Sequence, residues 1–187
     1  MKFAIVDLES TSLKADQGFI LCGGVRPLGG PSTVIGIHQT GFGAGRFNID
    51  RKLVVALRDE IDQYDGIVTW NGIMFDVPLL NDRLTIAGES LLREKFHIDI
   101  MYQARQGKST LPSSRLDWVA KAFKCPFKKT DLDINLWKEA EAEALAHFGN
   151  GRKSYNYILE HCGTDLEVTE WVFEKLKNRV RTISRRG

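Results

Sequence analysis

The chain has 187 residues, 43% of them hydrophobic, which favours one globular domain with a sizeable core and excludes a disordered chain. Its 26 Lys and Arg residues nearly balance 24 Asp and Glu residues, so a net charge of +2 excludes a strong overall attraction to polyanions. The three cysteines are widely spaced, which argues against a disulfide framework and a zinc site, and no run is long enough for a signal peptide or a membrane span. We therefore expect a single cytoplasmic domain over residues 1–187 with no membrane partner.

The first part of the chain predicts an antiparallel meander. Residues 2–10 contain four consecutive apolar residues, two of them β-branched, and read as a short buried strand. Residues 18–25 and 33–38 predict two more strands with a tight connection between them. The glycine-rich segment 41–45 is expected to be a loop without a nucleotide-binding role, because it lacks the lysine of a phosphate-binding loop.

A helix and a second buried strand follow the meander. Residues 49–64 carry apolar side chains at helical spacing, with Asp50 as the expected N-cap. Residues 66–70 then predict a strand that joins the sheet in parallel. At its carboxyl end, Asp76 and Pro78 form a good helix start, so helix capping is the structural alternative to a functional role for Asp76.

The second half of the chain predicts one strand and three helices, at residues 97–101, 116–123, 136–148 and 154–179. Segments 102–115 and 124–134 are polar and irregular, and we expect mobile loops there. The tail, residues 180–187, is basic, has no core pattern and is expected to fray. The two loops carry a set of cations that are candidates for contacting phosphates: Arg105, Lys108, Arg115, Lys124, Lys128 and Lys129.

Acidic side chains recur where these elements begin or end. Asp7 and Glu9 are two apart in a predicted strand, so they project from the same side of it. Two neighbouring carboxylates repel each other, and a hard divalent cation would compensate if they were buried. The alternative is a strand that ends in a polar turn with both acids in solvent. Tyr157, His161 and Asp165 are four apart and share one face of the last helix.

These segments, in this order, resemble the three motifs of the DEDD family of 3′→5′ exonucleases, which have a ribonuclease H-like fold. Residues 70–80 are especially similar to the proofreading domains of B-family DNA polymerases and their stand-alone relatives. The resemblance implies an α/β fold in which a mixed central sheet, an antiparallel meander plus parallel strands, is flanked by helices. The motifs are Asp7-x-Glu9, Asn71-x-x-x-Phe75-Asp76 and the final Asp165.

The chain departs from the family pattern in two places. In the family, a tyrosine four residues before the final Asp, or a histidine five before it, orients or deprotonates the attacking water. Here His161 stands at the tyrosine spacing, which makes it the candidate, with Tyr157 as the weaker choice and a structural histidine as the alternative. Ser10 replaces the usual threonine after Glu9, so either Ser10 or the following Thr11 is a candidate to meet the 3′-terminal nucleotide.

The resemblance implies hydrolysis of DNA or RNA from a 3′ end, with release of nucleoside monophosphates, by two divalent cations, Mg²⁺ or Mn²⁺. It implies that Asp7 bridges the ions, that Glu9 and Asp165 complete the site that activates water, and that Asp76 holds the second ion directly or through water.

Trp70, Asn71 and Phe75 are expected to hold the sugar and base of a single-stranded end, with core packing as the alternative for the two aromatic residues. Two other functions stay open: a structure-selective ribonuclease H-like endonuclease, and a nucleic-acid-binding module of the same fold that no longer cuts.

Overall fold

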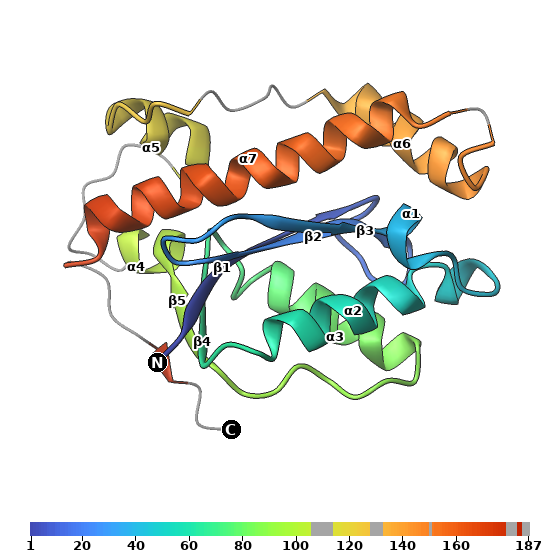
Figure 1. Cartoon of the computed structure of the whole chain (residues 1–187), viewed down its shortest axis with the longest axis horizontal. Helices are drawn as coiled ribbons and strands as arrows, with labels where there is room; N and C mark the ends of the chain where they lie inside the picture. Colours follow the sequence, from blue (N-terminus) through green and yellow to red (C-terminus); the bar gives the residue numbers. More distant parts are fainter. Residues whose placement is uncertain (106–113, 128–132, 150, 179–182, 185–187) are drawn as a thin grey trace.

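The computed structural model describes residues 1–105, 114–127, 133–149, 151–178 and 183–184. Within these residues six strands form one sheet in the order β3-β2-β1-β4-β5-β6. Helix α7 (Lys153–Leu176) crosses one face of the sheet, while α2 (Arg51–Ile61) and α3 (Asp76–Ile86) lie on the other face (Figure 1).

The sheet is mixed, as predicted. Strand β1 (Phe3–Ser10) pairs antiparallel with β2 (Ile20–Pro27), which pairs antiparallel with β3 (Thr33–Gly36). On its other edge β1 pairs parallel with β4 (Gly66–Thr69), and β4 pairs parallel with β5 (Phe96–Asp99). The apolar side chains of β1 are buried on both sides of the strand, as expected for a central strand between two helical layers.

Two predicted strands end earlier than expected because a short helix follows each of them. Strand β3 stops at Gly36 and α1 (Ile37–Thr40) begins, whereas we predicted a strand to residue 38. Strand β5 stops at Asp99 and α4 (Ile100–Arg105) begins. The Asp99 carboxylate accepts the Tyr102 N–H at 2.9 Å and so caps α4, which makes residues 102–105 helical rather than part of a loop.

The remaining helices follow the predicted pattern with shifted ends. Helix α5 (Leu116–Ala122) agrees with its prediction, and a single 3₁₀ turn, η1 (Arg46–Asn48), precedes α2. Helix α6 (Ile134–Leu145) starts earlier than expected because Asp133 accepts the Asn135 N–H at 2.9 Å, and it ends before His147 and Phe148, which have positive φ angles. Lys108, Lys128 and Lys129, three of the predicted basic loop residues, lie outside the described residues.

The tail that we expected to fray contains a strand. Residues Ile183–Ser184 form β6, which pairs antiparallel with Phe96 and His97 of β5. Without β6, β5 would be an edge strand with unpaired backbone N–H and C=O groups. The pairing with β6 provides partners for some of these groups. The other residues of the tail lie outside the described part of the chain.

Asp50 occupies the N-cap position of α2, as predicted, but its carboxylate does not cap the helix. It accepts the Ile20 N–H at 2.8 Å and pairs with Arg83 at 2.5 Å, with both side chains 1% exposed. Arg83 also donates to the carbonyls of Ala15 and Phe47, each at 2.8 Å. The buried pair therefore fastens two loops to the sheet.

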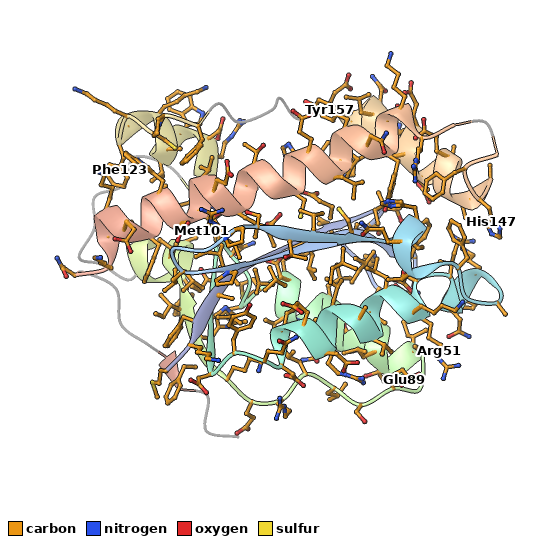
Figure 2. The ribbon with its side chains drawn as sticks, in the orientation of Figure 1. Arg51, Glu89, Met101, Phe123, His147 and Tyr157 are labelled. Atoms are coloured by element: carbon orange, nitrogen blue, oxygen red, sulfur yellow. The ribbon has the colours of Figure 1, made fainter. Side chains whose placement is uncertain are left out.

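A surface ion pair links the segment that follows α3 to the start of α2. Arg51, at the start of α2, donates to Glu89 at 2.8 Å, and the two side chains lie together in Figure 2. None of the helices within the described residues combines the length and the apolar character that a membrane crossing requires.

Candidate active site

The candidate site is built around the second half of β1. Asp7 and Glu9 are partly exposed and alternate with the buried Leu8, so they lie on the same side of the strand. Asp7 is opposite Gly24 and Glu9 is opposite Cys22 in the pairing with β2. The register shifts directly after Glu9, an irregularity that bends a strand and often occurs beside active sites.

Asp76 meets β1 through the backbone of Leu8. The parallel pairing of β1 with β4 runs only as far as Ile5 opposite Val68. Beyond that point the Leu8 N–H donates to Oδ1 of Asp76 at 3.0 Å. Asp76 therefore lies next to the residue between Asp7 and Glu9. Its carboxylate is used there rather than as a helix cap, because Phe75 occupies the N-cap position of α3 and no side-chain cap bond forms.

His161 and Asp165 reach the same region from α7. Nε2 of His161 lies 3.9 Å from Oε1 of Glu9 and 3.7 Å from Oδ2 of Asp165. His161 is 2% exposed and Asp165 is 7% exposed, so these groups meet in a largely buried place. Figure 2 shows Tyr157 on α7 beside α6, one turn before His161.

A glycine allows α7 to pack closely against the sheet at this point. A Cβ atom on Gly24 would lie 2.5 Å from Cδ1 of Leu166 and 3.0 Å from Sγ of Cys162, both too close for normal contact. Cys162 itself contacts the backbone oxygen of Asp7 at 3.9 Å. The close approach brings the α7 residues next to β1.

The site concentrates negative charge. Burial raises the pKa of Asp76 to about 7, opposed by the Leu8 N–H bond, and the negative charge of Asp99 raises it further. One carboxylate oxygen of Asp7 and one of Asp165 are also buried. Buried acids of this kind need compensation by cations or hydrogen bonds.

The types of residue present suit a hard divalent cation, since all four candidate ligands are carboxylates. Within the described ranges, however, no three His, Cys, Asp or Glu side chains are grouped closely enough to hold one ion. Asp7, Glu9, Asp76 and Asp165 therefore fit such an ion in their chemistry and converge from β1, α3 and α7. Their carboxylates would have to move closer together around it.

A pocket of about 600 Å³ opens beside Glu9. Ser10, Thr11 and Phe75, three of the predicted substrate residues, are among the residues that line it. The two hydroxyls also make local bonds: Ser10 donates to the carbonyl of Ser12 at 2.8 Å, and Thr11 accepts the Phe19 N–H at 3.1 Å.

The other two predicted substrate residues are not among those that line this pocket. The Trp70 indole N–H donates to the carbonyl of Ser114 at 3.0 Å, and its ring packs against a buried apolar cluster that includes Val68 and Val119. Asn71 has a φ of 73°, and its N–H donates to Asp99 at 3.2 Å. Both contacts shape the turn between β4 and α3.

Sequence reasoning missed three residues that shape the site. Asp99 accepts the N–H groups of Asn71 and of Ile73, the latter at 2.9 Å, and thereby holds the turn that presents Asp76. In the sequence, Asp99 could have been recognised as an acid at the end of a buried strand.

Trp137 lines the pocket, and in the sequence it is the single aromatic residue of a helix rich in Ala and Glu. Gly24 carried a signal too, because a glycine inside a strand often marks a close backbone approach.

Comparisons with known proteins agree with this architecture. The family model described as the RNase_H superfamily matches residues 4–177. The chain is similar in structure to the family B DNA polymerase from the hyperthermophilic archaeon Pyrobaculum calidifontis, with a TM-score of 0.64 and 17% sequence identity. The match covers 95% of this chain and 24% of the polymerase chain, so it extends over only about a quarter of that protein, and at this identity it shows the fold alone. No curated protein matches the chain significantly.

Proposed function

We propose that this chain, which belongs to the RNase_H superfamily, is a metal-dependent 3′→5′ exonuclease that hydrolyses DNA or RNA and releases nucleoside monophosphates. The RNase H-like fold supports nuclease activity and nucleic-acid binding, and nucleases of this fold generally use divalent metal ions. The direction of cutting and the exonuclease motifs come from the resemblance of the sequence to the DEDD family.

One observation carries the proposal: acids from three separate segments of the chain meet at β1. The Leu8 amide bonds Asp76 at 3.0 Å, and on the same strand Glu9 faces His161, one turn from Asp165. Each acid has an ordinary structural explanation, but those explanations are independent of one another. A shared cation site accounts for all of them together, and for their burial.

Asp7, Glu9, Asp76 and Asp165 are the residues that would hold two Mg²⁺ or Mn²⁺ ions. When bound, such ions lower the pKa of a water molecule and neutralise charge on the phosphate and the leaving oxygen. Nε2 of His161 lies near Glu9 and Asp165, where it would accept a hydrogen bond from the attacking water and orient it. The Leu8 amide keeps Asp76 beside β1 during this reaction.

The pocket beside Glu9 suits the terminal nucleotide of a single strand. Its volume of about 600 Å³ lies within the roughly 300–1,000 Å³ typical of small-ligand sites. Leu13 and Ile134, which are 81% and 73% exposed, add apolar surface to its lining, and Phe75 adds an aromatic ring. Apolar and aromatic surface of this kind favours unpaired bases over a closed duplex. Lys138 supplies a cation for the phosphate chain.

A 5′-labelled single-stranded DNA and an RNA of the same sequence, each with Mg²⁺, Mn²⁺ or EDTA, test the proposal. We expect stepwise shortening from the 3′ end that stops in EDTA. Asp7→Ala and Asp165→Ala should remove the activity and leave the fold intact, while Asp59→Ala, at a side chain 63% exposed on α2, serves as the matched control. Wild-type rates in Asp7→Ala or Asp165→Ala would contradict the proposal.

Circular single strands separate the two alternatives. A structure-selective endonuclease opens a circle, whereas an exonuclease leaves it intact. A binding module retains the labelled strand without cutting it under any metal condition. The presence of all four acids favours an enzyme, because burying carboxylates beside one strand without a cation is costly.

A further inference from the structure

The Trp137 side chain lies between a candidate catalytic residue and the pocket. Its ring meets that of His161 edge to face, with ring centroids 5.2 Å apart and planes at 87°. The same side chain lines the 600 Å³ pocket together with Glu9 and Phe75. One indole therefore contacts both the His161 imidazole and the space that we propose holds the 3′-terminal nucleotide.

Helix α6, which carries Trp137, is fastened to the start of α7. The Glu143 carboxylate accepts the N–H groups of Ser154 at 3.1 Å and of Tyr155 at 2.7 Å. These amides belong to the first turn of α7, where an anion is favoured by the helix dipole and by unpaired N–H groups. Glu139 accepts the Ser154 hydroxyl at 2.7 Å. Trp137 is thereby held in a fixed position relative to the helix that carries His161.

Small residues allow the two helices to pack closely. Ala140 and Ala144 are both fully buried in the core, one and two turns beyond Trp137. Because neither side chain adds bulk, α6 can lie close to its neighbours, and the large indole fills space beside His161. A perpendicular aromatic neighbour is a favourable arrangement for a buried ring and restricts its rotation.

The indole also provides what a nucleobase needs. Every base has a flat π-face, so stacking on an aromatic side chain tolerates any sequence. Trp137 and Phe75 line the same pocket from α6 and from the start of α3. A base that enters this pocket can therefore meet aromatic surface from two different elements.

We propose that Trp137 is a positioning and specificity-determining residue, which stacks with the base of the 3′-terminal nucleotide and holds the orientation of His161 through the same ring. This inference rests on the proposed function, since it assigns a role within the same pocket. It follows that a 3′ end with its base in place is processed better than an end that lacks the base.

Two oligonucleotides test this role: one with a normal 3′-terminal nucleotide, and one identical except for an abasic nucleotide at that end. For Trp137→Ala we expect KM to rise about tenfold on the normal end and to stay unchanged on the abasic end. We expect kcat to fall on both, because the orientation of His161 is lost. Trp137→Phe should restore most of both losses, and Trp137→Leu, which fills space without stacking, should restore only kcat.

The control is Trp118→Ala, which removes a tryptophan that is 56% exposed on α5 and is absent from the residues that line the pocket. Circular dichroism and thermal melting identify any variant that fails to fold, and Trp137→Leu then replaces Trp137→Ala in the comparison. An equal KM rise on both ends would overturn base stacking, and an unchanged kcat would overturn the positioning of His161.

A binding measurement separates failure of this inference from failure of the proposed function. Titration with a nucleoside monophosphate in EDTA, followed by tryptophan fluorescence, does not depend on hydrolysis. We expect quenching in the wild-type protein and in Trp118→Ala, and its loss in Trp137→Phe. If the wild-type protein cuts neither oligonucleotide, the proposed function fails. If quenching persists without Trp137, the inference fails.

Discussion

Replacing Gly24 with alanine tests whether the contact between α7 and the sheet sets the geometry of the site. Gly24 lies opposite Asp7, and an added Cβ would be 2.5 Å from Cδ1 of Leu166 and 3.0 Å from Sγ of Cys162. Carbon atoms in contact need about 3.5–4.0 Å. Cδ1 of Leu166 ends a flexible side chain and can rotate away, whereas Cγ of Leu166 and Sγ of Cys162, both at 3.0 Å, require α7 to shift by roughly 0.5 Å. Leu166 and Cys162 directly follow Asp165 and His161 in the sequence, so this movement reaches both residues.

The expected effects on stability and on activity differ in size. Overpacking a core position costs about 1–3 kcal/mol, and for a domain of this size each kcal/mol lowers Tm by about 2–4 °C. A displacement of about 1 Å at an active site can lower a rate about hundredfold, so a shift of about half that size should lower it about tenfold. We therefore expect Gly24→Ala to stay folded, with a modest fall in Tm, and to lose about tenfold in nuclease kcat.

Gly163→Ala is the matched control because it makes the same chemical change one residue after Cys162. A Cβ at Gly163 has an ordinary contact, with Cγ2 of Val34 at 3.6 Å as its nearest neighbour. Replacing a glycine inside a helix with alanine stabilises a protein by about 0.5–1 kcal/mol. We expect Gly163→Ala to raise Tm and keep the wild-type rate. The reasoning is refuted if Gly24→Ala has the wild-type Tm and rate, or if both variants change alike.

Three other changes test the energetics of the fold and of the site. Burial raises the pKa of Asp76 from 3.8 to about 7, so in the metal-free protein the contribution of this group to stability, up to about 4 kcal/mol, should be lost as pH rises from below 4 to above 7. Asp76→Asn should flatten this dependence in urea unfolding with EDTA, and a curve parallel to wild type would contradict it. Asp50→Ala leaves the buried Arg83 without its carboxylate partner and should cost about 3–5 kcal/mol, whereas Asp50→Leu combined with Arg83→Met should cost less. Thermal unfolding measures the stability of both variants, and an equal loss of stability in the single and the double variant would contradict this expectation. Glu143→Gln should weaken the bonds to the first turn of α7 and lower stability by about 1 kcal/mol in the same assay, and an unchanged Tm would show that this clamp is unimportant.

The sheet and its covering helices could be predicted because their signals are local. The apolar run in β1, the helical spacing in α2 and the long stripe of α7 each lie within one element, and their predicted types are confirmed. The resemblance to a ribonuclease H-like fold is also confirmed, by the family match over residues 4–177. Boundaries were less accurate, since β3 and β5 each give way to a helix after four residues.

Two of the errors share one physical cause, which is a partner far away in the sequence. Aspartate is a residue type that often caps helices, yet the Asp50 carboxylate accepts hydrogen bonds from Arg83, which lies 33 residues away. The tail has no pattern of its own, yet Ile183 pairs with His97 of β5. A distant partner also acts at Asp76, which was predicted as a site residue with helix capping as the alternative: only the folded chain reveals that its oxygen accepts the amide of Leu8.

The candidate site was predictable in its acids but not in its surroundings. The spacing of Asp7 and Glu9 on one strand, and of His161 and Asp165 on one helix, determines which side chains share a face. The distance between that strand and that helix depends on Gly24, and the pocket wall depends on how α6 docks against α7 through Glu143. Neither packing distance nor helix docking can be read from residue spacing. The roles of the individual site residues stay predictions.

The hydrogen bond from Leu8 to Asp76 has a consequence for how the site tolerates change. The donor is a main-chain amide, so a different side chain at position 8 alters packing in the core but leaves the donor in place. A change of the side chain at position 8 therefore leaves the hydrogen bond that fixes Asp76 beside β1 in place. Conversely, an amide-to-ester exchange at Leu8 would release Asp76 without replacing a single side chain, and deuterium exchange at this amide reports how firmly the acid is held.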